Sequence, residues 1–64
     1  MNKSLLVSWR GTFIRDEKET RVFHLKFEAV DAAEATQVVS DYIDRLMTDG
    51  WYKRRDRMRA VRRK

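Results

Sequence analysis

Residues 31–50, DAAEATQVVSDYIDRLMTDG, have the pattern of one amphipathic helix. Apolar side chains recur there at spacings of three and four, which places them on one side of a helix; they are Ala35, Val38, Val39, Tyr42, Ile43 and Leu46. Asp31 and Glu34 have the spacing of a capping box, in which both side chains accept hydrogen bonds from free backbone N–H groups. Gly50 can adopt a positive φ just past the last turn. We therefore predict a helix over about residues 32–49.

Two segments on the N-terminal side of this helix alternate in polarity with the period of a β-strand. The core phase of residues 5–13 and 21–30 contains Leu5, Val7, Trp9, Gly11, Phe13, Phe23, Leu25, Phe27 and Ala29. The polar stretch 16–20 has hairpin-loop length but no Asn-Gly or Asp-Gly pair to define a two-residue turn. We predict an antiparallel hairpin with Phe13 opposite Phe23 and Trp9 opposite Phe27. A shift of two residues would preserve the same faces.

The segment that follows the helix decides how the sheet is completed, because a hairpin under one helix is marginal in water. Residues 51–61 as a short third strand give the order ββαβ and place Tyr52 and Met58 on one face. As a helix, the same residues give ββαα, with Trp51, Met58 and Val61 in a thin apolar stripe. The crossover geometry favours the strand. The predicted fold is α+β, an antiparallel hairpin packed on one amphipathic helix, with ββαβ ahead of ββαα and its basic C-terminal helix.

Length and composition predict one small domain, residues 1–64, that is not stabilised by disulfide bonds or a structural metal site. A chain of 64 residues lies below the size at which one core usually gives comfortable stability, so we expect a homodimer. Cysteine is absent, which excludes disulfides, cysteine-based zinc sites and thiol nucleophiles. No apolar run approaches the roughly 18 residues that span a bilayer, and no secretory signal is evident. We expect a cytoplasmic protein with no membrane partner.

Positive charge is concentrated after the helix. The whole chain carries a formal charge of +5, with a pI near 10.1. Residues 51–64 contain eight basic residues and one acidic residue, a net charge of +7, whereas residues 1–50 carry a net charge of −2. The domain therefore divides into a ββα body, residues 1–50, and a basic Arg-rich C-terminal segment, residues 51–64. Such asymmetry is typical of a folded body that presents cations to an anionic partner.

No combination of residues in the chain indicates catalysis. A chain of this length has little volume for a cleft, and its single histidine, His24, falls in the polar phase of the second strand. There is no Gly-rich phosphate loop, no Gly-x-Ser-x-Gly and no His-x-Glu motif. Asp31 and Glu34 are accounted for by helix capping, and Asp41 and Asp44 fit a solvated helix face better than a cation site. We expect a protein that is not an enzyme and has no cofactor or metal site.

The basic segment predicts binding to DNA or RNA. A segment dense in arginine gains affinity by displacing counterions from phosphates, and its guanidinium groups can fork onto phosphate or guanine. Trp51 and Tyr52 either stack on unpaired bases or plug the end of the core. Arg10 and Lys26 lie in the non-core phase of the hairpin and could extend the basic surface. The predicted nucleic-acid-binding residues are Trp51, Tyr52, Lys53, Arg54, Arg55, Arg57, Arg59, Arg62, Arg63, Arg10 and Lys26.

A protein-interaction module is the alternative function. In that case the chain is an inhibitor or accessory subunit that docks its basic segment on an acidic partner surface. The apolar residues left in the non-core phase of the hairpin support it; they are Leu6, Ile14, Val22 and Val30. The same residues could form the interface of a homodimer, either by completing one sheet or by packing face to face.

Overall fold

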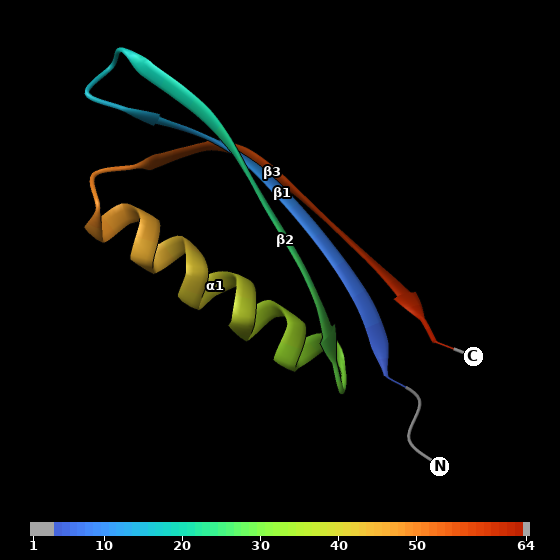
Figure 1. Cartoon of the computed structure of the whole chain (residues 1–64). Coiled ribbons are helices and arrows are strands. Elements are labelled where there is room, and N and C mark those ends of the chain that lie inside the picture. The colour runs from blue at the N-terminus through green and yellow to red at the C-terminus, as the bar shows by residue number, and fades with distance from the viewer. Residues whose placement is uncertain (1–3, 64) are drawn as a thin grey trace.

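The computed structural model describes residues 4–63 as a three-stranded antiparallel sheet with one helix on one of its faces (Figure 1). The elements are β1 (Leu5–Arg15), β2 (Glu19–Ala29), α1 (Ala32–Thr48) and β3 (Tyr52–Arg62). The strand order is β2-β1-β3, so the last strand of the chain completes the sheet beside the first. The predicted α+β class is confirmed and the ββαα alternative is wrong. β3 is as long as β1 and β2, 11 residues each, so it is not the short strand that we expected.

The N-terminus of α1 is capped as its sequence predicts. Asp31 is the N-cap residue, and its Oδ1 accepts a hydrogen bond from the backbone N–H of Glu34 at 2.8 Å. The Glu34 carboxylate reaches back to the N–H of Val30 at 2.7 Å, one residue earlier than in a standard capping box. These bonds satisfy backbone donors that a helix start otherwise leaves to water.

The C-terminus of α1 is closed by a Schellman motif. The N–H of Gly50 donates to the carbonyl of Met47 at 3.0 Å, and the N–H of Trp51 donates to the carbonyl of Leu46 at 2.9 Å. Gly50 has a φ of 93°, which a side chain would strain. The motif turns the chain sharply back toward the sheet. As a result the ring of Trp51 packs edge to face against Phe23, with centroids 5.3 Å apart.

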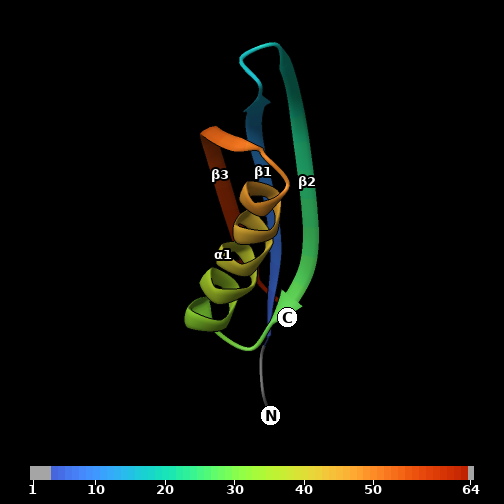
Figure 2. The same cartoon turned by 90° about the vertical axis from the view of Figure 1, so that its left-hand side faces the viewer.

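The core lies between α1 and the helix-facing side of the sheet (Figure 2). Trp9 and Phe13 of β1 are its largest fully buried side chains. The ring of Trp9 meets Tyr42 edge to face at 5.6 Å, and the ring of Phe13 meets Phe23 in the same way at 5.6 Å. Both rings of β1 also close over Gly11. A Cβ atom at Gly11 would lie 2.5 Å from the Trp9 ring and 2.7 Å from the Phe13 ring.

The hairpin register differs by two residues from the one that we predicted. Trp9 lies opposite Leu25 rather than Phe27, and Phe13 lies opposite Arg21 rather than Phe23. The apolar faces remain aligned, because an even shift preserves them. The prediction of the faces was therefore correct, and the prediction of the individual pairs was wrong.

The hairpin turn explains this register. Asp16 and Glu17 both adopt a positive φ, 56° and 57°, and the N–H of Lys18 donates to the carbonyl of Arg15 at 3.2 Å. Positive φ at two consecutive central residues is typical of the tight hairpin turns that match strand twist. Pairing therefore begins at Arg15 and Glu19 and leaves three residues in the loop. The predicted register would have needed a loop of five.

β3 contains a bulge that changes which face its first residues occupy. Its register against β1 shifts between Thr12 and Phe13, and Arg54 is the extra residue on β3. Before the bulge, even-numbered residues of β3 therefore face away from α1, whereas after the bulge the odd-numbered residues do. Tyr52 lies on the face away from α1, and Met58 lies on the helix-facing side. The expectation that these two residues share a face is wrong.

The molecule is slender and one face of its sheet has no covering layer. Its principal extents are 47 × 16 × 12 Å, and its radius of gyration is 13.1 Å. A compact domain of this length has a radius of gyration of about 11 Å. The helix runs along one face of the sheet only, as Figures 1 and 2 show. Within residues 4–63, no helix is long and apolar enough to cross a membrane.

Candidate nucleic-acid interface

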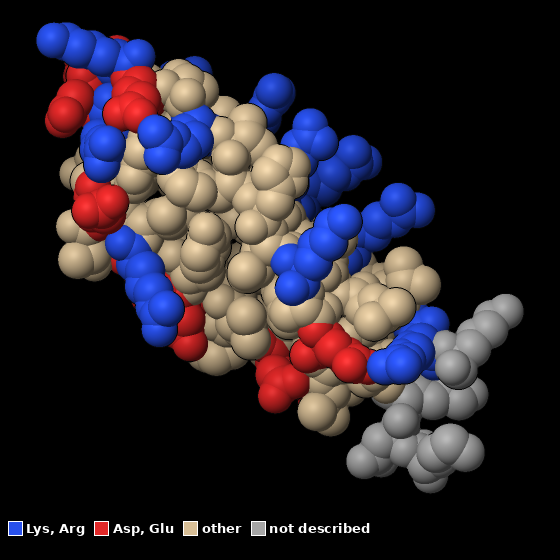
Figure 3. Space-filling view, in the orientation of Figure 1, with Lys and Arg blue, Asp and Glu red and all other residues tan. Residues whose placement is uncertain are grey.

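The face of the sheet opposite α1 carries a cluster of basic side chains, which we call the outer basic face. It consists of Arg10 from β1, Lys26 from β2, and Arg55, Arg57 and Arg59 from β3. All five side chains are exposed. Figure 3 shows Lys and Arg side chains projecting from the side of the sheet away from α1, whereas acidic side chains gather near the hairpin turn and along the helix.

Strand pairing arranges the outer basic face in three neighbouring rows, each running across β2, β1 and β3. The rows are Lys26, Ser8 and Arg59; His24, Arg10 and Arg57; and Val22, Thr12 and Arg55. No row contains a carboxylate. Arg10 and Arg57 lie directly opposite one another on neighbouring strands, which lowers stability because like charges repel.

None of these five basic residues forms an ion pair within residues 4–63, whereas four basic residues elsewhere do, namely Arg15, Arg21, Lys53 and Arg63. Arg15 contacts Glu19 at 3.2 Å and Asp49 at 3.7 Å, and Arg21 contacts Glu19 at 2.8 Å. The guanidinium carbons of Arg15 and Arg21 also lie 4.4 and 5.3 Å from the centre of the Trp51 ring. The cations that support the fold are therefore separate from those of the outer basic face.

Asp56, the one acidic residue of the basic C-terminal segment, is directed to the helix-facing side of β3 opposite Gly11. Its Oδ2 accepts a hydrogen bond from the indole N–H of Trp9 at 2.9 Å, and its Oδ1 lies 3.2 Å from Nζ of Lys53. The indole bond, followed by the bond and charge of Lys53, holds the pKa of Asp56 below its ordinary value of 3.8. This carboxylate therefore serves the core and does not neutralise the arginines beside it.

Glu28 lies beyond the rows of the outer basic face, opposite Leu6. Its carboxylate accepts hydrogen bonds from the hydroxyl of Ser4 and from the guanidinium of Arg63, the latter at 2.6 Å. These two bonds, that of Ser4 first, lower the pKa of Glu28. Because Glu28 and Arg63 neutralise each other, the acidic residue nearest to Lys26 on β2 does not cancel the charge of the face.

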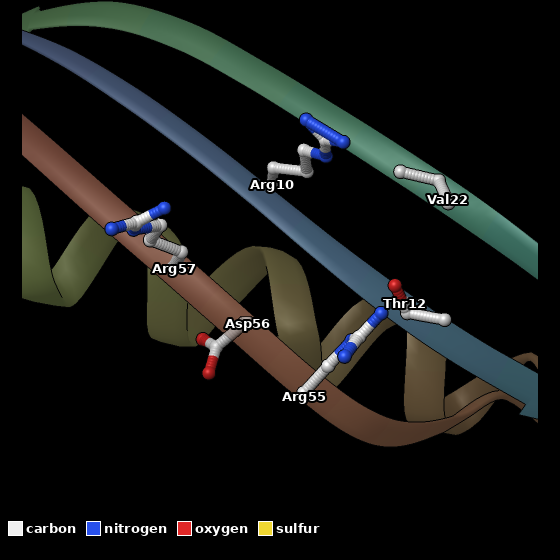
Figure 4. A pocket seen from close by; sticks show the side chains of 6 residues that line it. All are labelled: Arg10, Thr12, Val22, Arg55, Asp56 and Arg57. Carbon is white, nitrogen blue, oxygen red and sulfur yellow. The ribbon is translucent and has the colours of Figure 1, made fainter.

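A shallow depression lies across β1 and β3 on this side of the sheet. It is lined by Arg10, Thr12, Val22, Arg55, Asp56 and Arg57 (Figure 4). Figure 4 shows Arg10, Thr12, Arg55 and Arg57 on the side of the sheet away from the helix, whereas the carboxylate of Asp56 bonds to Trp9 on the helix-facing side. The lining offers three guanidinium groups and one hydroxyl donor, with Val22 and with Asp56, whose carboxylate is engaged by Trp9 and Lys53. Such a surface suits an extended anion better than a small apolar ligand.

Trp51 does not belong to this surface, although we had placed it among the nucleic-acid-binding residues. Its side chain is 2 % exposed and packs in the core with Trp9, Phe13 and Val39. The reason is the Schellman motif, which directs the residue after Gly50 back under the helix. The ring is not available to stack on a base, and the alternative that it plugs the end of the core is confirmed.

The other predicted residues divide between the two sides of β3. Arg10, Lys26, Arg55, Arg57 and Arg59 form the outer basic face, and Tyr52 lies at its end opposite Ile14, 62 % exposed. Lys53 and Arg62 pair with Phe13 and Leu5 on the helix-facing side. Arg54 lies at the bulge, and Arg63 is bound to Glu28. Five of the predicted residues thus lie together on the outer basic face, and the others lie elsewhere.

No protein-family model, no curated protein and no solved structure matches this chain. The function must therefore be argued from the chemistry of the site, because fold alone does not determine function. Within residues 4–63, no three His, Cys, Asp or Glu side chains are grouped so that they could hold a metal ion. The outer basic face can present cations and hydrogen-bond donors to an extended anion.

Proposed function

We propose that this protein binds nucleic acid through its outer basic face and has no catalytic role. The observation that carries the proposal is a set of five exposed basic side chains on the sheet face that α1 leaves uncovered, none of which forms an ion pair with another residue of the described range 4–63. Gathering like charges in this way costs stability, and local rules of this kind are broken mainly at functional sites. The ten remaining basic residues are balanced by ten acidic ones, so this face accounts for the net charge of +5.

Binding would work by neutralising phosphates. Successive outer-face residues of a strand are about 6.8 Å apart, so Arg55, Arg57 and Arg59 form a line of cations about 14 Å long. Each phosphate that is neutralised releases condensed counterions, and log K falls with log salt by roughly 0.9 per phosphate on duplex DNA. Five contacts therefore predict a slope of about −4.5. The affinity would depend little on base sequence where only phosphates are contacted.

Fluorescence anisotropy with labelled DNA and RNA oligonucleotides tests the proposal directly. We expect binding at about 50 mM salt and a Kd that rises about 500-fold between 50 and 200 mM, as the slope above implies. Absence of binding to every oligonucleotide at about 50 mM salt would contradict the proposal, because electrostatic contacts are strongest there.

A pair of charge-matched variants tests whether the outer basic face is the site. The variant R57Q/R59Q removes two cations from the face, and we expect the salt slope to fall to about −2.7. The control K18Q/R45Q removes two cations from the hairpin turn and from the exposed side of α1. It should retain the slope of the original chain. If both variants weaken binding equally, net charge rather than this face governs the affinity.

A protein partner with an acidic surface is the second candidate. It is supported by apolar side chains that border the basic rows at both ends of the face, Leu6 and Val61 at one end and Tyr52 at the other. Protein interfaces combine such apolar contacts with charged groups. Affinity capture from native lysate with and without nuclease separates the two candidates. A partner that survives nuclease and is lost with R57Q/R59Q would favour the protein interface.

A homodimer is not part of this proposal. We expected one because a single core in a chain of 64 residues is small, and in the structure β3 of the same chain adds a third full-length strand to the sheet. Packing two copies through their outer faces would oppose the same five positive charges from each copy. The free face is better suited to an anion.

A further inference from the structure

The three rows of the outer basic face contain no tryptophan, tyrosine or phenylalanine, and His24 is their one aromatic ring. The tryptophans and phenylalanines of the chain are Trp9, Phe13, Phe23, Phe27 and Trp51, all on the helix-facing side or in the core. Tyr52 is exposed on the outer side but lies beyond the basic rows, so only the His24 ring remains within them. Proteins that hold single-stranded nucleic acid depend on aromatic side chains on which successive bases stack. The face is therefore better suited to a duplex, whose bases are already stacked.

The width of the strands indicates which groove of a duplex the outer basic face could enter. Three strands at about 4.8 Å spacing give about 10 Å between the axes of β2 and β3. The major groove of B-form DNA is about 12 Å wide and admits a two-stranded β-ribbon, which here would be β1 and β3, whereas the minor groove is about 6 Å wide. The major groove of A-form RNA is deep and narrow and excludes a sheet. Because α1 lies wholly on the other face, nothing within residues 4–63 blocks the sheet from entering a groove (Figure 2).

The strands of the face carry different chemistry, and the difference indicates how they would lie. β3 presents Arg55, Arg57 and Arg59 along one edge of the sheet, which suits the phosphates on one side of a groove. The central strand presents Ser8, Arg10 and Thr12. Hydroxyl groups and guanidinium forks are donors that can reach base edges, and arginine pairs with O6 and N7 of guanine. The arrangement places phosphate contacts at the edge and possible base contacts in the middle.

We propose that the ligand of the outer basic face is double-stranded DNA, with the face lying in the major groove and β3 along one phosphate strand. This inference rests on the proposed function and specifies its ligand. It requires that binding discriminate duplex DNA from single strands and from duplex RNA, and that it depend on an open major groove.

The test is an anisotropy panel of four labelled oligonucleotides of one sequence: duplex DNA, single-stranded DNA, duplex RNA, and duplex DNA whose cytosines carry glucosyl-hydroxymethyl groups at C5. Those groups fill the major groove and leave phosphates and minor groove unchanged. We expect unmodified duplex DNA to bind at least about tenfold more tightly than each of the other three. The variant K18Q/R45Q should show the same ranking.

The outcomes separate this inference from the proposed function. Equal or tighter binding to single strands, to duplex RNA or to the glucosylated duplex would overturn the major-groove assignment and leave nucleic-acid binding in place. Failure of all four probes at about 50 mM salt would overturn both. Circular dichroism on each protein sample verifies that variants remain folded.

Discussion

At the scale of single residues, Asp56 links β3 to the core through its hydrogen bond to the buried indole of Trp9. The variant D56A removes the acceptor and leaves the indole N–H unsatisfied, so we expect a loss of about 1–3 kcal/mol in the free energy of unfolding. The variant D56N keeps an acceptor of similar shape and should lose less. Urea unfolding followed by tryptophan fluorescence measures both. Equal losses in the two variants would contradict this role of the acceptor.

The same residue predicts a pH dependence. The pKa of Asp56 is lower in the folded chain than its ordinary value of 3.8, so its ionised form stabilises the fold. That contribution is fully present above about pH 4 and is lost as the pH falls through the folded pKa. The gap in free energy of unfolding between the original chain and D56N should therefore narrow under acid conditions. A gap that stays constant between about pH 6 and pH 2 would count against the linkage.

Gly11 is required because the rings of Trp9 and Phe13 close over it. The variant G11A inserts a methyl group at 2.5 Å from an indole ring, so rings or backbone must move. We expect a loss of about 1–3 kcal/mol in thermal or urea unfolding. The variant S8A on the same strand serves as the control, because its side chain faces outward, and it should stay within about 0.5 kcal/mol of the original chain. Similar effects in both variants would mean that strand propensity, not ring contact, is measured.

At the scale of elements, the helix and the hairpin faces could be predicted because their signals are local. The caps of α1 depend on Asp31, Glu34 and Gly50, each within a few residues of the backbone group that it serves. Register was missed because Asp16 and Glu17 adopt positive φ without the Asn or Gly that would reveal it.

β3 was only weakly predictable because all of its residues are exposed, so it has no apolar phase. Arg55, Arg57 and Arg59 were among the residues predicted from the basic segment, but the prediction did not separate them from Lys53, Arg54, Arg62 and Arg63, which lie elsewhere. The bulge at Arg54 could not be predicted from the local sequence, because it depends on the pairing of β3 with β1. Trp51 was placed at the interface because a sequence does not show in which direction a helix C-cap sends the next residue.

The pairing of β1 with β3 predicts that one substitution can raise the stability of the fold while it lowers the affinity for nucleic acid. Arg10 and Arg57 are directly opposite one another, so R57T should raise the free energy of unfolding by about 0.2–1 kcal/mol at low salt. The gain should shrink as salt screens the repulsion, while nucleic-acid affinity falls. The control R59T replaces an arginine that lies opposite Ser8, and it should gain less. A larger gain for R59T than for R57T would show that the repulsion is not the cause.

At the scale of the whole molecule, the two sides of the sheet have separate tasks. The helix-facing side holds the buried aromatic residues and the ion pairs of Arg15 and Arg21 with Glu19, whereas the outer side holds unpaired cations. This division explains how a chain of 64 residues keeps a core while leaving one sheet face open. The extents of 47 × 16 × 12 Å fit this arrangement, because two layers, one sheet of long strands and one helix, make up the molecule within residues 4–63.

The separation of charge also affects how the molecule meets an anion in solution. Because the net charge resides on one side of a flat body, the centre of charge is displaced from the centre of mass, and the chain behaves as an electric dipole. A polyanion approached within a Debye length exerts a torque on this dipole and turns the cationic side toward itself before contact. Rotational search, which normally slows docking, is thereby shortened, and the association rate rises at low ionic strength.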